Sequence, residues 1–300
     1  MAEFLTTREL AALLRVKERK IYDLVSAGSL PVRRVTGKLL FPRKDIEEWI
    51  AGPDGQGGEE EALHAPAAAG EAGHLPLIVA GGHDPLLEWA LRESRSGIAV
   101  FLDGALDGLE RAARGECTAV GLHIPEKDGW NVGTVEGRFS REPWVLLEWA
   151  RRVRGLMFRR DLPRPPKRLS DARGLRFQAR QPEAGSELVL DMLLAQEKLK
   201  RSDLSPVESV ERSETDLALA IAGGRADVGL GIEAAARQHQ LGFLPLVEER
   251  FDLLVWRKAY FDPPFQKLVA FCREPAFQAR AADLGGYDVT GFGTVRYNGC

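Results

Sequence analysis

The chain has 300 residues, of which 44% are hydrophobic and 28% are charged. This is the composition of a soluble globular protein, and the length is enough for about two domains. The three cysteines, Cys117, Cys272 and Cys300, show no paired spacing, which argues against a disulfide framework and a zinc site and fits a reducing compartment. Since no leader-like segment or long apolar run is present, we expect a cytoplasmic protein that does not enter a membrane.

The formal net charge of −3 is unevenly distributed along the chain. Residues 1–50 carry ten Lys or Arg against seven Asp or Glu, whereas residues 52–74 carry five acidic residues and no basic one. The second segment is also rich in Gly, Ala and Pro, so it has too little apolar surface to offset the entropy of ordering. We therefore predict a basic head (residues 1–51), a flexible acidic linker (52–74) and a nearly neutral body (75–300).

The head begins with a helix-start signal. Thr6 and Glu9 have the spacing of a capping box, and apolar residues follow at Leu10, Leu13 and Leu14. After this helix the pattern predicts, in chain order, a turn at 15–17, a second helix ending at Gly28, β-strands at 30–35 and 39–41 that form a hairpin, and a helix over 44–50.

This order of elements resembles the winged helix-turn-helix domain of the excisionase and MerR types over the whole head. The residues that carry the resemblance include Leu5-Thr6-Thr7, Glu9-Leu10-Ala11, Ile21-Tyr22, Gly28, Leu30-Pro31, Phe41-Pro42-Arg43, Asp45-Ile46 and Trp49-Ile50. In such domains a recognition helix enters the major groove of DNA and basic wing residues contact phosphates. The resemblance therefore implies double-stranded DNA as a partner.

The candidate DNA contacts fall into two groups. For the major groove they are Lys17, Glu18, Arg19, Lys20 and Tyr22, and for the backbone or minor groove they are Arg33, Arg34 and Lys38. Lys17 stands where the family usually has a Ser or Thr cap. The competing interpretation is a small protein-interaction domain with ordinary solvated charges.

The body alternates between strand-like and helix-like segments. Apolar runs at 75–80, 98–102 and 117–123 are separated by glycine-containing turns and helical patterns, which is typical of an α/β fold with a mainly parallel sheet. Residues 115–120 and 224–229 resemble each other, and this predicts two similar lobes. The runs at 243–247 and 251–256 are expected to supply strands that return to the first lobe.

The body also resembles the two-lobed, periplasmic-binding-protein-like domain related to molybdate- and tungstate-binding proteins. The motifs include Gly82-His83-Asp84, Leu106-Asp107-Gly108-Leu109, Ala119-Val120-Gly121, Arg154-Gly155-Leu156, Arg180-Gln181, Gly224-Arg225-Ala226-Asp227 and Glu249-Arg250-Phe251-Asp252. This resemblance implies a small anionic ligand. Asp103-Gly104-Ala105 and Gly185-Ser186-Glu187 depart from the family's Gly-Ser and Gly-Thr pairs, so a molybdenum-cofactor-related compound or another organic anion competes with molybdate or tungstate.

Ligands of two-lobed α/β proteins lie at the carboxyl ends of the strands. Arg180 and Ser186 are the first candidates, because a guanidinium and a helix start both favour an anion. The full set of candidate ligand residues is Gly82, His83, Asp84, Asp103, Gly104, His123, Asn131, Arg180, Gly185, Ser186 and Glu214. For each histidine a hydrogen-bonded turn or core role competes with ligand binding, and for Glu214 a helix-capping role does.

These patterns predict a ligand-responsive transcriptional regulator, in which closure of the body changes the geometry or dimerisation of two DNA-binding heads. We expect a homodimer with a small-molecule or oxyanion effector, and no cofactor, metal site or catalytic residue. One alternative is a DNA-architectural, excisionase-like accessory factor. A second is an enzyme of cofactor assembly, although no G-x-S-x-G, HExxH or phosphate-binding-loop motif is present.

Overall fold

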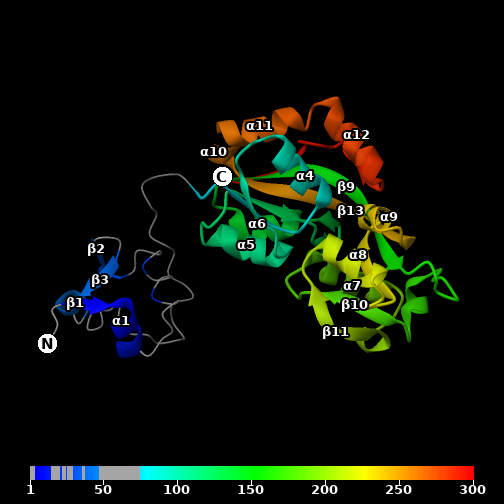
Figure 1. Ribbon diagram of the computed structural model, residues 1–300. Coiled ribbons are helices and arrows are strands. Elements are labelled where there is room, and N and C mark those ends of the chain that lie inside the picture. Colours follow the sequence, from blue (N-terminus) through cyan, green and yellow to red (C-terminus); the bar gives the residue numbers. More distant parts are fainter. Residues whose placement is uncertain (1–3, 15–20, 22–24, 26–29, 36–37, 47–74) are drawn as a thin grey trace. The chain divides into compact units, whose positions relative to one another are not determined.

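A computed structural model describes residues 4–14, 21, 25, 30–35, 38–46 and 75–300. Contacts divide the chain into two units, Met1–Pro66 and Ala67–Cys300, and each is described by itself below (Figure 1). Among the described residues, no helix has both the length and the apolar character that a membrane crossing requires.

The head contains a small antiparallel sheet and a short helix. Its described elements are β1 (Phe4–Thr6), α1 (Thr7–Leu13), β2 (Arg33–Val35) and β3 (Lys38–Pro42), with strand order β1-β3-β2. The predicted hairpin is confirmed, and β1 is an additional strand that the sequence patterns did not indicate. Residues 43–46 are helical, and the rest of the helix expected over 44–50 lies outside the described residues.

The predicted capping box is present at the start of α1. The backbone N–H of Thr6 donates to Glu9 Oε2 at 2.8 Å, and the N–H of Glu9 donates to Thr6 Oγ1 at 3.3 Å. Both bonds satisfy amides that a helix start leaves without an intrahelical partner. The helix packs its apolar side against the sheet in a small core that includes Leu5, Leu10 and Phe41.

One ten-stranded sheet runs through the described body. Its main order is β11-β10-β12-β9-β13-β6-β4-β5, and β14 and β15 pair with β9 beside that path. The strands are β4 (Ile78–Gly81), β5 (Ala99–Phe101), β6 (Ala119–Leu122), β9 (Trp144–Phe158), β10 (Arg176–Arg180), β11 (Ser205–Glu211), β12 (Val228–Ile232), β13 (Gly242–Trp256), β14 (Tyr287–Asp288) and β15 (Val295–Asn298). Strands β7 (Pro125–Glu126) and β8 (Gly129–Trp130) form a separate pair.

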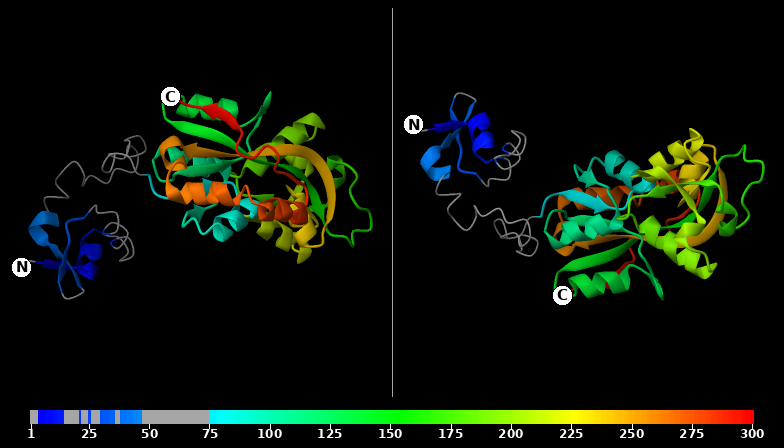
Figure 2. Two further views of the ribbon diagram at one scale, coloured as in Figure 1. Left: turned by 90° about the horizontal axis from the view of Figure 1, so that it is seen from above. Right: turned by 90° about the horizontal axis from the view of Figure 1, so that it is seen from below.

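The sheet forms two lobes joined by two long strands. β4, β5 and β6 are parallel in the first lobe, and β10, β11 and β12 are parallel in the second. The antiparallel strands β9 and β13, each of 15 residues, pass through both lobes, and β13 arcs between them (Figure 2). The two runs expected at 243–247 and 251–256 are thus one continuous strand, which returns to the first lobe as predicted.

Helices cover both faces of the sheet. They are α4 (Pro85–Glu93), α5 (Ala105–Ala113), α6 (Val132–Phe139), α7 (Gly185–Gln196), α8 (Glu214–Ala222), α9 (Glu233–Gln238), α10 (Arg257–Tyr260), α11 (Pro263–Phe271) and α12 (Pro275–Leu284), with 3-10 turns at Leu169–Ala172 and Arg201–Asp203. In the first lobe, α4, α11 and α12 lie on one side and α5 on the other (Figure 1). Alternate residues of β4 serve the two cores, Val79 on the α4 side and Ala80 on the α5 side. The internal similarity is confirmed, because α5 leads into β6 as α8 leads into β12.

Candidate ligand-binding site between the lobes

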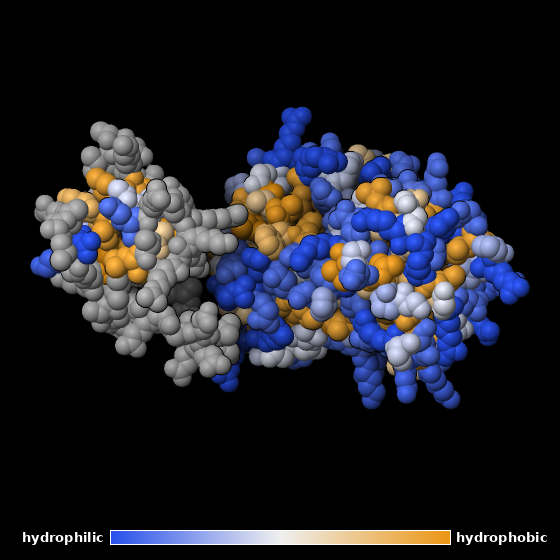
Figure 3. Space-filling view, turned by 60° about the horizontal axis from the view of Figure 1, so that its bottom comes forward, coloured by the Kyte–Doolittle hydropathy of each residue, from blue (hydrophilic) through white to orange (hydrophobic). Residues whose placement is uncertain are grey.

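Hydrophilic residues cover most of the body's surface on the face in Figure 3, as is usual for charged side chains. Where the two lobes meet, however, several charged side chains are buried. Arg and Glu are almost never fully buried unless they are paired. Six residues form what we call the interlobe charge cluster, and each is at most 5% exposed: Asp84, Arg152, Arg154, Arg180, Glu214 and Glu249. Asp84 follows β4 of the first lobe, Arg180 ends β10 of the second, and the arginines of β9 and Glu249 of β13 lie on the strands that join them.

The centre of the cluster follows from strand alternation. Arg152 and Arg154 are two residues apart on β9 and therefore point to the same face, and Arg152 is paired in register with Glu249 on β13. Arg152 Nε donates to Glu249 Oε1 at 2.5 Å, and Arg154 Nε donates to Glu249 Oε2 at 2.7 Å. One carboxylate therefore holds two guanidinium groups in fixed positions.

Glu214 connects this centre to Arg180. Arg154 Nη2 donates to Glu214 Oε1 at 2.9 Å, and Arg180 Nη1 lies 3.1 Å from the same oxygen. The other nitrogens of Arg180 donate to the backbone carbonyls of Glu211, at the end of β11, at 2.9 Å and of Arg212, which follows it, at 2.8 Å. Arg180 is thus oriented by the second lobe with one nitrogen directed at Glu214.

Asp84 anchors the cluster to the first lobe. It caps α4 by accepting from the N–H of Leu87 at 2.7 Å, and it also accepts from Arg152 Nη1 at 2.7 Å and from the Tyr287 hydroxyl at 2.6 Å. Burial, followed by the charge of Asp84, raises the pKa of Tyr287 well above its ordinary value, so this hydroxyl remains a donor. Asp84 therefore has a helix-capping role and an ion-pairing role at once.

The lobes are closed against each other around the cluster. The N–H of Glu214 donates to His83 Nδ1 at 3.3 Å, and the N–H of Leu106, at the start of α5, donates to the carbonyl of Glu183 at 3.0 Å. Asp103 makes two such contacts: its carboxylate pairs with Arg212 at 2.5 Å, and its carbonyl accepts from Gln181 Nε2 at 3.0 Å.

His123 and the start of α7 adjoin the cluster. His123 Nδ1 lies 3.2 Å from Glu249 Oε2, and a Cβ added to Gly185 would lie 2.9 Å from the His123 ring. Burial lowers the pKa of His123, an effect that Glu249 only partly offsets, so the ring is neutral near pH 7. The cluster therefore contains three cations and three carboxylates.

Several buried atoms here lack a hydrogen bond within the part of the chain that the structure describes. They are Arg152 Nη2, Arg154 Nη1 and Ser186 Oγ, together with Arg180 Nη1, which meets Glu214 only as an ion pair. Buried polar groups are almost always hydrogen-bonded, so each such group needs an explanation. All four atoms are hydrogen-bond donors. The cluster and the neighbouring start of α7 could therefore bind the acceptor oxygens of a ligand.

The electrostatic compensation differs among the three arginines. Burial would lower the pKa of Arg152 and Arg154, but neighbouring carboxylates outweigh it and raise both values. Burial lowers the pKa of Arg180, and Glu214 only partly compensates. Among the three guanidiniums, Arg180 is therefore the one whose charge its neighbours compensate least.

Glu214 makes the free energy of unfolding depend on pH in the acidic range. Burial would raise its pKa, but Arg154 and Arg180 outweigh that effect and hold it at about 2 against an ordinary 4.5. A carboxylate with a lowered pKa stabilises the folded state above its unfolded pKa and loses that contribution as the pH falls. We expect the free energy of unfolding to drop by about 2 kcal/mol from this group between pH 5 and pH 3.

Urea unfolding of the wild type and Glu214→Gln across this pH range measures the contribution. The variant should lack it, so its stability should depend less steeply on pH. Parallel curves for the two proteins would show that Glu214 is not held ionised by its arginine partners.

Three further candidate residues have local structural roles. Gly82 donates its N–H to the Gly121 carbonyl at 2.8 Å, and Gly104 has a positive φ of 124° at a point where a Cβ would lie 2.6 Å from the Glu183 carbonyl oxygen. Asn131 belongs to a separate network, where it donates to Asp252 Oδ2 at 2.7 Å. The structure thus brings His83, Asp84, His123, Arg180, Gly185 and Glu214 together and buries Ser186 beside Gly185 at the start of α7. It holds Asp103 and Gly104 at the lobe contact and does not connect Asn131 directly to the cluster.

Sequence reasoning did not select Arg152, Arg154 or Glu249 as ligand residues. The detectable signal was the alternation of Arg152 and Arg154 inside a mainly apolar 15-residue strand. In the head, the candidate residues Lys17, Glu18, Arg19, Lys20 and Tyr22 lie outside the described residues. The structure places Arg33 and Arg34 on strand β2 and Lys38 on strand β3 of the hairpin.

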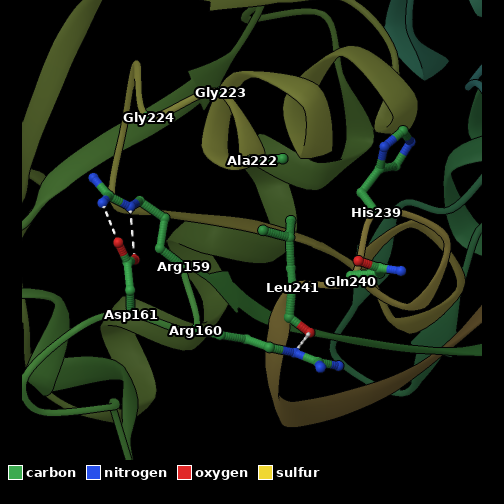
Figure 4. Close-up of a pocket in the computed structure, with 9 residues that line it drawn as sticks. All are labelled: Arg159, Arg160, Asp161, Ala222, Gly223, Gly224, His239, Gln240 and Leu241. Carbon is green, nitrogen blue, oxygen red and sulfur yellow. Dashed lines mark hydrogen bonds and ion pairs between the residues drawn. The ribbon is translucent and has the colours of Figure 1, made fainter.

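A cavity of about 440 Å³ lies elsewhere, where the ends of β9, α8 and α9 meet (Figure 4). Its lining includes Arg159, Arg160, Asp161 and His239. Arg159 and Asp161 pair with each other, and Arg160 Nε donates to the Leu241 carbonyl at 3.4 Å. The charged groups of this cavity form ordinary surface pairs, whereas the interlobe cluster contains buried donors that lack a hydrogen bond among the described residues.

Comparisons with known proteins agree with this architecture. A family model described as a PBP superfamily domain matches residues 88–273, and one described as a helix-turn-helix domain matches residues 4–53. The uncharacterized protein YvgK of Bacillus subtilis (strain 168) is 24% identical over 307 residues, covering 97% of this chain and 96% of YvgK.

Two solved structures illustrate the shared fold. A protein from Clostridium perfringens, described as a phosphate ABC transporter substrate-binding protein with bound phosphate, has a TM-score of 0.54 at 11% identity and covers 71% of this chain and 98% of its own. A mutant OxyR from Corynebacterium glutamicum, with bound H₂O₂, has a TM-score of 0.50 at 10% identity, with coverage of 93% and 89%. The chain thus carries a helix-turn-helix domain at its N-terminus and belongs to the PBP superfamily.

Proposed function

We propose that this protein is a ligand-responsive DNA-binding regulator whose body closes on a small anion. The observation that carries the proposal is a set of buried donors that lack a hydrogen bond among the described residues, three on the arginines of the interlobe cluster and one on Ser186 at the start of α7. The helix-turn-helix head supports double-stranded DNA as the second partner. A homodimer is proposed because two heads on a two-fold operator double the specific contacts.

The chemistry of the site favours a compact oxyanion as the ligand. Guanidinium groups bind carboxylates and tetrahedral oxyanions through paired N–H donors, and Arg180 is the least compensated of the three buried guanidiniums. Molybdate and tungstate are the first candidates, and a molybdenum-cofactor-related compound or another organic anion is the alternative. A small ligand can change DNA affinity 5- to 150-fold with about 1–3 kcal/mol of coupling.

Calorimetry of the full chain with molybdate, tungstate and phosphate tests the ligand class. Replacing Arg180 by methionine should weaken binding by roughly 10- to 100-fold, because it removes a charged donor from a buried site. Arg176→Met is the matched control, since Arg176 lies on the same strand but is exposed and pairs with Asp227. Absence of binding to all three anions at millimolar concentration, or equal effects of the two substitutions, would contradict the anion site.

The DNA-binding role of the head is tested by substitution in the expected recognition helix. Arg19→Ala should weaken binding to a selected operator, whereas Arg34→Ala in the wing should reduce the slope of affinity against salt concentration by about 1. The measurement is a salt titration of operator binding with and without the effector. Unchanged affinity and salt slope in both variants would contradict these roles, and DNA bending without any ligand response would favour the architectural alternative.

A further inference from the structure

Glu214 is placed to act on the ligand site rather than on its own helix. It is the first residue of α8, but the preceding Ser213 already caps that helix by accepting from the N–H of Asp216 at 2.9 Å. The side chain of Glu214 is therefore not needed as the cap, and it is 1% exposed among the arginines of the cluster. A buried carboxylate in this position calls for a different explanation.

The contacts of Glu214 are those expected of a bound oxyanion. Its Oε1 lies between Arg154 Nη2 at 2.9 Å and Arg180 Nη1 at 3.1 Å, and its Oε2 accepts a long bond of 3.3 Å from the N–H of Ile232. Arg154 also has its Nη1 without a hydrogen bond among the described residues, whereas Arg180 Nη1 meets Glu214 only as an ion pair. A carboxylate of the chain itself thus occupies the oxygen position that the guanidiniums of Arg154 and Arg180 provide.

Charge balance shows what an incoming anion must do. With three arginines, three carboxylates and a neutral His123, the cluster has no net charge, so a dianion added to it would leave two uncompensated negative charges in a buried site. If the anion instead takes the place of the Glu214 carboxylate, the negative charge of Glu214 moves away from the arginines, and only one negative charge remains uncompensated beside them. Exchange is therefore favoured over addition.

We propose that Glu214 is an internal counter-ion that the ligand displaces from Arg154 and Arg180. The inference rests on the proposed anion site and specifies its selectivity. A monocarboxylate gains nothing by replacing a carboxylate that is already tethered at high effective concentration. A dianion with several oxygens can also use the donors that Glu214 leaves unpaired, so the site selects compact dianions against simple carboxylates.

The test compares anion binding by the full-length wild type, Glu214→Gln and Asp227→Asn, measured by calorimetry with molybdate, phosphate and acetate. Asp227 is the matched control, because this carboxylate of the second lobe pairs with Arg176 at 2.7 Å and lies 3.6 Å from Arg159, outside the cluster. The Gln variant should bind the dianions at least about tenfold more tightly than the wild type and should gain binding of acetate. The Asn control should behave as the wild type does.

The outcomes separate this inference from the proposed function. Dianion binding of equal strength in the wild type and Glu214→Gln overturns the counter-ion role and leaves the anion site standing. Tighter dianion binding by Glu214→Gln than by the wild type supports the counter-ion role, and absence of binding by both proteins overturns the counter-ion role and the anion site together. If Glu214→Gln does not fold without an added anion, Glu214→Ala is examined by thermal unfolding. Added acetate should raise the unfolding midpoint of this variant more than it raises the midpoint of the wild type or of Asp227→Ala. No such difference would count against the proposal.

Discussion

Replacing Glu249 by alanine is expected to destabilise the body by about 3–5 kcal/mol. Glu249 is 0% exposed and holds Arg152 and Arg154 through three hydrogen bonds, so its loss leaves two buried guanidinium groups short of acceptors. Burial would raise the pKa of Glu249, but the arginines outweigh it and hold the value well below 4.5, so the charge that is removed is present at neutral pH. Urea unfolding followed by tryptophan fluorescence measures the change.

The neighbouring residue supplies the control for this substitution. Glu248 is on the same strand, but its side chain is 59% exposed and pairs with Arg151 at the surface. Exposed ion pairs contribute little, so Glu248→Ala should change the free energy of unfolding by less than about 1 kcal/mol. Similar losses in the two variants would mean that burial of the cluster does not determine the cost.

Replacing Gly155 by alanine is expected to cost about 3 kcal/mol and to weaken the ligand response. Gly155 lies where β9 passes from one lobe to the other, between Gly231 of β12 and Pro245 of β13. An added Cβ would lie 1.9 Å from the Leu244 carbonyl oxygen and 2.9 Å from the Cα of Pro245. Because these are backbone atoms, the strands themselves would have to separate.

Gly137→Ala is the matched glycine control. Gly137 lies within α6, and a Cβ added there would meet no atom within 4 Å. Alanine in a helix should therefore raise stability by about 0.5–1 kcal/mol. Thermal unfolding of both variants, with and without molybdate, separates the effects, and equal midpoints for Gly155→Ala and the wild type would show that the two strands tolerate the added group.

The features that were predictable from the sequence are local. The Thr6–Glu9 capping box, the hairpin in the head and the alternation of strands and helices in the body all depend on residues that are close together in the chain. Their signals are turn residues, helix caps and the periodicity of apolar side chains, and these act before distant segments meet. The similarity of residues 115–120 and 224–229 likewise indicated two lobes, because each segment repeats the same step from helix to strand.

The chemistry of the site depends on segments that are far apart in the chain. Arg154 reaches Glu214 across 60 positions and Glu249 across 95, and Arg152 reaches Asp84 across 68. Whether these charges pair depends on the register of β9 against β13 and on closure of the lobes. Neither feature can be predicted from residues that are neighbours in the chain. Polar candidates could thus be selected from the sequence by residue type. Which of them share a site depended on long-range strand pairing and burial, which place Arg152, Arg154 and Glu249 in the cluster and Asn131 in a separate network.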